Sequence, residues 1–141
     1  MKNYTRHDER IKTMQALYAL FVALENNNEY DATQLILDQY GAKSIEEVPV
    51  YSRCVYAIAL EHYDEIVSIV SKYLVKWTFN RLANVDKAIL FLGVADGRFA
   101  KITPPKVVID ECVILAKNYS DLENYRYINA VLNKAIIEDG N

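Results

Sequence analysis

The sequence predicts an all-α protein of about seven helices, arranged as two small helical bundles that pack together. Glycine and proline are scarce, with four and three residues in a chain of 141, so little interrupts the long segments between them. Within those segments apolar residues recur at spacings of three and four, the period of an α-helix. No segment shows the alternation of a half-buried strand. The length suits one compact domain, with an N-terminal helical half of about 1–45 and a C-terminal helical half of about 46–141.

Two helices are expected in the N-terminal half. The first runs from about Thr5 to Leu24 and carries an apolar stripe made of Ile11, Met14, Tyr18, Phe21 and Val22. Asp31 followed by Gln34 has the spacing of a capping box and predicts a short second helix. That helix is expected to end at Gly41, because glycine readily adopts the left-handed conformation that terminates helices.

The longest helix is expected in the middle of the chain. Ser44 with Glu47 repeats the capping-box spacing, and helical periodicity then continues from Tyr51 to Leu74. Residues 77–82 predict a turn or a short helix. The very apolar segment 85–94 that follows is expected to form the buried centre of the molecule.

Two further helices complete the expected fold. Thr103 before Pro104 predicts a helix start, since a hydroxyl cap precedes a proline at the first helical position, and this helix should reach about Asn118. Ser120 with Glu123 predicts another capping box, which opens a last helix that extends to about residue 137. Gly93 and Gly97 are expected to allow close helix packing or to end the apolar helix.

Composition excludes several classes of function. Sixteen basic against 19 acidic residues give a net charge of -3, so a nucleic-acid site would have to be a local basic patch. Cys54 and Cys112 lie in apolar runs and are expected to be core thiols, and with His7 and His62 far apart they form no metal-ligand pattern. The N-terminus resembles neither a signal peptide nor a membrane span, which predicts a cytoplasmic protein.

No catalytic motif is recognisable in the sequence. Neither histidine belongs to a nucleophile or metal motif, and no glycine-rich phosphate loop occurs. The adjacent carboxylates Asp110 and Glu111 point to different sides of a helix. The sequence therefore predicts a protein that is not an enzyme and that needs no cofactor or metal.

A basic helical face is the first candidate binding surface. Lys2, Arg6 and Arg10 are spaced by four and should share one face of the first helix, with His7 nearby, and such a face can bind phosphates. Because acidic residues interrupt it, charge alone favours an ordinary solvated helix end.

Tyr127 is the second candidate. On a helical wheel it lies away from the apolar stripe of the last helix, beside Glu123, and an outward aromatic ring can stack on an unpaired base. With 11 tyrosines in the chain, a surface tyrosine without a function is the alternative.

Four segments together resemble the signature segments of the NusB family, in order and in spacing. They are Gln15-Ala16-Leu17-Tyr18, Val85-Asp86-Lys87-Ala88-Ile89-Leu90, Thr103-Pro104 leading to Ala116-Lys117, and Tyr127-Ile128-Asn129-Ala130-Val131-Leu132. The resemblance implies an all-helical fold of two small bundles. It also implies a transcription antitermination factor that, with the ribosomal protein NusE, binds boxA-type single-stranded RNA of ribosomal RNA operons within the RNA polymerase antitermination complex.

The resemblance also implies site residues. The RNA-binding positions of the family fall on Lys2, Arg6, His7 and Arg10 in the first helix, and on Glu123 and Tyr127 near the C-terminus. The positions that contact NusE fall on Tyr18 and Asp86. Asn129 and Trp77 are expected to be structural, in the core.

Several alternatives remain beside this interpretation. The N-terminal arginine run of the family is diluted here to Arg6 and Arg10, which favours a low RNA affinity without NusE. One alternative is an RNA-handling module related to the N-terminal domain of ribosomal RNA cytosine methyltransferases. Another is a protein-interaction scaffold that has lost RNA binding, and self-association into a homodimer is a further alternative.

Overall fold

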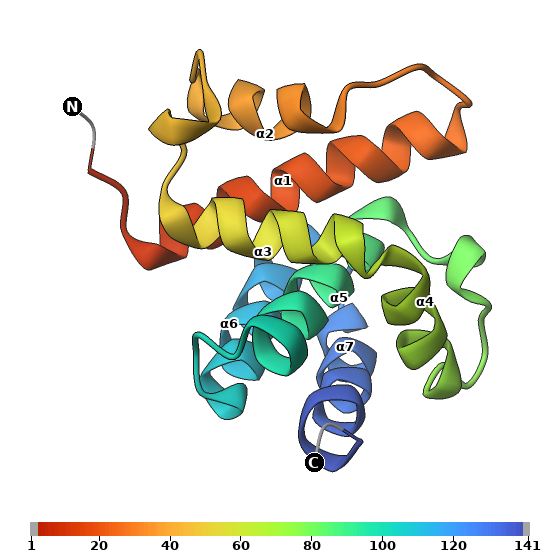
Figure 1. The fold of residues 1–141 in the computed structure, drawn as a ribbon. Coiled ribbons are helices and arrows are strands. Elements are labelled where there is room, and N and C mark those ends of the chain that lie inside the picture. The colour runs from red at the N-terminus through yellow and green to blue at the C-terminus, as the bar shows by residue number, and fades with distance from the viewer. Residues whose placement is uncertain (1–2, 140–141) are drawn as a thin grey trace.

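The computed structural model describes residues 3–139, so Lys2 lies outside the described residues. Within this range the chain forms seven α-helices and no strand, which confirms the predicted all-α class (Figure 1). The helices are α1 (Arg6–Glu25), α2 (Ala32–Tyr40), α3 (Val50–Glu61), α4 (Tyr63–Lys72), α5 (Asn84–Val94), α6 (Pro105–Tyr119) and α7 (Asn124–Leu132). Single 3-10 turns occur at Ile45–Glu47 and Phe79–Arg81, and π-helical segments at Ala95–Ala100 and Asn133–Glu138 continue α5 and α7.

The centre of the molecule is α5, as the apolar segment predicted. Every residue from Asp86 to Gly97 is buried. Helix α1 packs along α5 and also contacts α2 and α3, while α6 and α7 pack on α5 and on each other. In Figure 1, α1, α2 and α3 form the upper part of the molecule, and α5, α6 and α7 lie below them. Buried residues from both sides of residue 45 belong to one hydrophobic cluster, and the division into two halves stays a prediction.

Local capping chemistry sets the ends of the first two helices. Thr5 and Asp8 form a reciprocal capping box at α1, and the backbone hydrogen bond from Thr5 lowers the pKa of the Asp8 carboxyl. The Asp31 carboxylate accepts hydrogen bonds from the next helix's first turn, and Gly41 ends α2 with a φ of 58°. The start at Asp31 and the end at Gly41 are confirmed, but the capping box is only half formed, because the Gln34 side chain donates to Asp38 instead.

The predicted long helix from Tyr51 to Leu74 is wrong, because the chain bends at His62 and forms α3 and α4 instead. The longest helix is α1, with 20 residues. His62 stacks on Phe99 at 4.3 Å between ring centroids, and its ring nitrogen lies 3.1 Å from the Glu65 carboxylate. Apolar periodicity runs on through this bend, so the sequence pattern gives no sign of it.

The predicted capping boxes at Ser44 and Ser120 do not form at α-helices. Ser44 precedes only the 3-10 turn, where its hydroxyl contacts Glu47. Glu123 takes a left-handed conformation with a φ of 72°, so α7 begins at Asn124, three residues beyond the expected start, and the Ser120 hydroxyl bonds to Asp86 instead. Helix α6 likewise begins at Pro105, one residue beyond the expected position.

Two glycines let the central helix and its extension approach α7 and its extension closely. Of the two roles expected for Gly93 and Gly97, close helix packing is therefore the one observed. A Cβ atom at Gly93 would lie 2.9 Å from the Leu132 side chain, and one at Gly97 would lie 2.9 Å from Ile136. Cys112 is buried beside Gly93, whereas Cys54 is only partly buried. Among the helices between residues 3 and 139, none is long and apolar enough to cross a membrane.

Candidate nucleic-acid interface

Two of the predicted RNA-binding residues lie accessible at the start of α1. The Arg6 guanidinium sits 4.4 Å above the Tyr51 ring, and its Nε lies 3.1 Å from the Glu9 carboxylate. The His7 ring nitrogen lies 3.4 Å from the Glu111 carboxylate of α6. These contacts orient both side chains, yet 47% and 44% of their surfaces remain exposed. Arg6 and His7 can therefore still reach a phosphate.

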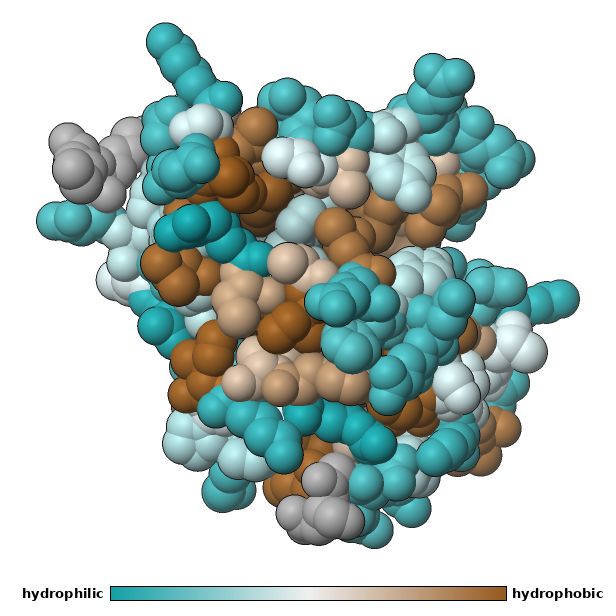
Figure 2. All heavy atoms as spheres, in the orientation of Figure 1, coloured by the Kyte–Doolittle hydropathy of each residue, from teal (hydrophilic) through white to brown (hydrophobic). Residues whose placement is uncertain are grey.

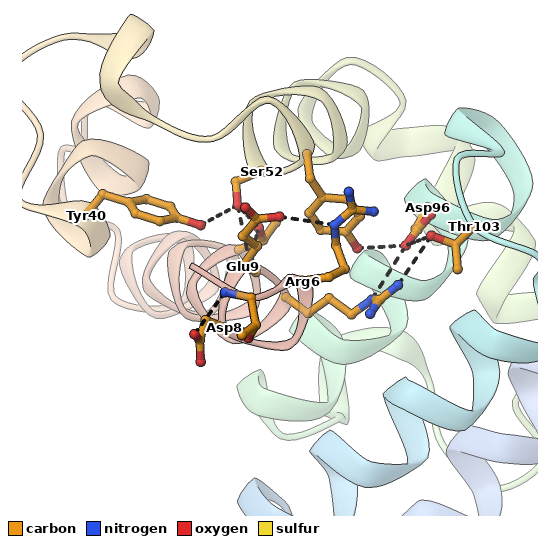
Figure 3. Close-up of polar contacts among 11 residues, drawn as sticks. Arg6, Asp8, Glu9, Tyr40, Ser52, Asp96 and Thr103 are labelled. Carbon is orange, nitrogen blue, oxygen red and sulfur yellow. Dashed lines mark hydrogen bonds and ion pairs between the residues drawn. The ribbon is translucent and has the colours of Figure 1, made fainter. Parts of the chain in front are cut away.

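Arg10 does not share this exposed face, so that part of the prediction is wrong. Arg10 is only 5% exposed. Its Nε lies 3.9 Å from Asp96 Oδ2, and its guanidinium donates a 3.3 Å hydrogen bond to the Thr103 hydroxyl. Figure 3 shows Asp96 and Thr103 next to each other, with dashed lines from both that meet at one guanidinium, while Arg6 lies nearer to Glu9. Arg10 is buried because it pairs with Asp96, a carboxylate that is far away in the sequence.

The Asp96 cluster, made of Asp96, Arg10, Tyr51 and Thr103, fixes the start of α1 against α3 and the loop before α6. The Tyr51 hydroxyl donates a 2.7 Å hydrogen bond to Asp96 Oδ2, and the Thr103 hydroxyl lies 3.4 Å from the same oxygen. Burial raises the pKa of Asp96, although the three partners each act in the opposite direction. Asp96 Oδ1 and Arg10 Nε have no hydrogen-bond partner. The cluster is thus incompletely satisfied.

Asp86 lies at the other end of α5 and is only 2% exposed. Three donors of this chain cover its carboxylate, which argues against the expected direct contact between Asp86 and a partner protein. The Ser120 hydroxyl donates to Oδ1, and Oδ2 accepts hydrogen bonds from the Asn124 amide at 3.0 Å and the Tyr127 hydroxyl at 2.7 Å. We call these four residues the Asp86 cluster.

Tyr127 is half-buried rather than fully outward. One part of its ring packs against the hydrophobic core, and its hydroxyl is held by Asp86. Burial and this hydrogen bond raise the pKa of the Tyr127 phenol, so it stays protonated and acts as a donor. Glu123 is exposed, 3.5 Å from the Arg126 guanidinium. Tyr18, the other expected partner contact, is 45% exposed on α1.

A cleft that the sequence did not predict opens beside Tyr127. It has a volume of about 530 Å³ and lies between α7 and the segment 73–83, which links α4 to α5. Trp77 lines it and is 58% exposed, so the prediction of a core tryptophan is wrong. Lys76 and Arg81 line the same cleft. The sequence signal that could have indicated this cleft is an aromatic residue next to a lysine in a linking segment.

Asn129 also differs from its predicted place in the core. It is exposed on α7, where its side-chain oxygen and backbone carbonyl both accept hydrogen bonds from Asn133. Its role is confined to the surface of the helix. Within residues 3–139, no three or more histidine, cysteine, aspartate or glutamate side chains gather as a metal site would require.

Apolar side chains on the face shown in Figure 2 lie between hydrophilic ones that project around them.

Fold and site together define a small helical protein whose candidate interface combines exposed cations at one end of the central helix with an aromatic cleft at the other. The NusB family model matches residues 7–136. The chain therefore belongs to the NusB family.

Relatives and solved structures agree with this assignment. The chain is 33% identical to the transcription antitermination protein NusB of Geobacillus kaustophilus, over 92% of this chain and 93% of that protein. It is 34% identical to the Bacillus subtilis protein of the same name, over 91% and 92%. A crystal structure of antitermination factors NusB and NusE in complex with dsRNA contains a similar chain, with a TM-score of 0.77, 26% identity, and coverage of 93% and 95%. Thermotoga maritima NusB, 24% identical, has the same fold with a TM-score of 0.77 over 99% and 98% of the two chains.

Proposed function

We propose that this chain is an RNA-binding transcription antitermination factor that acts in the cytoplasm with the ribosomal protein NusE. In this role the pair binds boxA-type single-stranded RNA from ribosomal RNA operons and tethers it to the elongating polymerase. The observation that carries the proposal is family membership over nearly the whole chain, together with the likeness to a chain crystallised with NusE and RNA.

The geometry supports two separate contacts with one RNA strand. Helices α1 and α5 are antiparallel, since Arg10 lies beside Asp96 while Phe21 lies near Lys87. The exposed Arg6 and His7 thus lie toward one end of α5, and Tyr127 lies beside Asp86 at the other. Ten residues of helix separate the two carboxylates, about 15 Å at the helical rise per residue. A strand that touches both must run along the molecule, with phosphates near Arg6 and a base near Tyr127.

The basic surface on α1 is smaller than the spacing of Lys2, Arg6 and Arg10 predicted. Arg10 is buried, so Arg6 and His7 carry the described part of this surface. A strand bound through so few phosphate contacts gains little electrostatic affinity. RNA binding by this chain is therefore expected to depend on NusE. Tyr18, exposed on α1, is proposed as a direct NusE contact, and Asp86 as a residue that acts by positioning Tyr127.

A paired titration tests the proposal. Fluorescence anisotropy of a labelled boxA-like RNA is measured with and without NusE, beside a scrambled RNA of equal length. Preference for the boxA-like sequence, strengthened by NusE, is expected. Arg6→Ala should weaken binding and reduce the slope of log affinity against log salt by about 0.7, the value for one phosphate contact on a single strand. Lys134→Ala removes an equally charged exposed side chain at the far C-terminal segment and serves as the control.

Equal binding of both RNAs in the presence and absence of NusE would reject the proposal. The burial of Arg10 favours one competing role, a protein scaffold without RNA contact. Capture of NusE with no gain from added RNA is the result that would establish that role instead.

A further inference from the structure

The cleft between Trp77 and Tyr127 has the features of a base-binding site. It is open to solvent and has a volume of about 530 Å³, within the range of small-molecule sites and large enough for one nucleotide unit. One wall comes from the segment 73–83 and the other from α7. Figure 1 shows that segment, in light green, at the edge of the molecule where α4 ends.

Trp77 is the unusual component of this cleft. Its side chain is 58% exposed, and the neighbouring Val75 is 95% exposed. A tryptophan left in water forgoes the large gain from burial in the core, so a surface that later covers the ring recovers that gain. Base stacking does this without regard to sequence, because every base has a flat π face. The ring is thus placed where a ligand can cover it.

The charges around the cleft favour a nucleotide over an uncharged ligand. Lys76 and Arg81 lie on the wall that carries Trp77, where they can neutralise the phosphates that flank a stacked base. Two carboxylates also line the cleft. The oxygens of Asp86 already accept hydrogen bonds from Ser120, Asn124 and Tyr127, whereas Asp121 is exposed at the wall opposite Lys76 and Arg81. Asp86 therefore contributes little free acceptor capacity, and a phosphate fits only on the wall of Lys76 and Arg81, away from Asp121.

We propose that this cleft, which we call the Trp77 cleft, binds one unstacked base of the single-stranded RNA, with the base stacked on Trp77 and its phosphates beside Lys76 and Arg81. The proposal rests on the RNA-binding function proposed above and adds a subsite to it. Tyr127 closes the opposite wall, and the Asp86 hydrogen bond fixes its ring there before RNA arrives. A preformed wall reduces the entropy lost on binding.

Intrinsic fluorescence gives a direct test, because Trp77 is the only tryptophan of the chain. A short unlabelled boxA-like RNA is titrated into the full chain with NusE present, using a tryptophan-free NusE variant so that only Trp77 reports. Saturable quenching with the same midpoint as the anisotropy titration is expected. An RNA of the same length with abasic sites retains the phosphates and should quench far less.

Substitution supplies the second readout. Trp77→Ala is expected to weaken RNA binding roughly 5- to 150-fold, the range for loss of one base–aromatic stack, and Trp77→Phe should recover most of it. Tyr30→Ala removes another exposed aromatic ring, outside the cleft, and should leave affinity unchanged. Circular dichroism confirms that each variant is folded.

Two results would overturn this inference alone, and a third would reject the proposed function with it. RNA binding by anisotropy, with no change in Trp77 fluorescence and full affinity in Trp77→Ala, would leave the function intact and the cleft unused. A fluorescence change caused by NusE alone, with no further change on adding RNA, would assign the cleft to a protein partner. Absence of any RNA binding would reject both proposals.

Discussion

The central helix and its extension carry two buried carboxylates, and the surrounding residues stabilise each of them in a different way. Asp86 and Asp96 are both nearly inaccessible, at 2% and 0% exposure. Asp86 is surrounded by neutral donors that occupy both of its oxygens. Asp96 has a cation, Arg10, beside it, yet Oδ1 has no partner and burial raises the pKa of its carboxyl.

The difference shows that a counter-ion is not the only way to bury a carboxylate. Desolvation of an ion pair costs several kcal/mol for each ion, whereas hydrogen bonds from neutral donors can satisfy a carboxylate without burying a second charge. The Asp86 cluster also places one of its donors, Tyr127, on the wall of a cleft. The Asp96 cluster instead withdraws a basic residue from the surface. The Asp86 cluster thus supports one wall of the cleft, whereas the Asp96 cluster makes the basic surface of α1 smaller.

Arg10→Ala should produce the largest effect on stability. It leaves the Asp96 carboxylate buried without its cation, and removal of one partner of a buried pair costs about 3 kcal/mol or more. Urea denaturation followed by circular dichroism measures this loss. Arg126→Ala, which removes an arginine that is 68% exposed, is the control and should change stability very little.

The same variant also tests the assignment of Arg10 to the interior. Because Arg10 is buried, the salt dependence of RNA binding by folded Arg10→Ala should equal that of the unmodified chain. A reduced slope would mean that Arg10 reaches phosphate, and would contradict its burial beside Asp96.

Asp86→Asn should have the next largest effect. The amide keeps one acceptor oxygen, but an NH2 group in place of Oδ2 faces both the Asn124 amide and the Tyr127 hydroxyl, so the two buried hydrogen bonds to Oδ2 are disrupted. The expected cost is about 2 kcal/mol. RNA affinity should fall as well, since Tyr127 loses its fixed position. A variant as stable as the original would show that the cluster rearranges freely.

Tyr127→Phe sharpens this test by keeping the ring and removing only the hydroxyl. The lost hydrogen bond goes to a charged acceptor at 2.7 Å, and its contribution to stability is about 1.5 kcal/mol. If the hydroxyl serves only to position the ring, RNA affinity should decline less than in Tyr127→Ala. Equal loss of affinity in the two variants would instead indicate a direct contact between the hydroxyl and RNA.

Much of the fold could be predicted because capping residues and apolar runs act locally. The site was harder to predict because its residues contact side chains that are far away in the sequence. The end of α2 at Gly41 and the burial of α5 follow from short stretches of sequence. A helical wheel placed Arg10 beside Arg6, but it contains no information about Asp96, which is more than 80 residues away. Trp77 was misplaced for a similar reason, because a residue type that usually packs in cores gives no sign that its segment lies at the edge of a cleft.

The pH dependence of stability should report on Asp96 with the smallest and most specific effect. The pKa of Asp96 is raised in the folded state, so the folded chain holds this proton at a higher pH than the unfolded chain does. The contribution of Asp96 is therefore most favourable below the unfolded value of about 3.8 and declines as pH rises through the folded pKa. Asp96→Asn, which cannot titrate, lacks this decline. The stability of the original chain minus that of the variant should consequently be larger in acid than at neutral pH, measured by urea denaturation across that range. A difference that stays constant with pH would mean that Arg10 and Tyr51 fully offset the burial of Asp96, and that the missing partner of Oδ1 has no effect on its protonation.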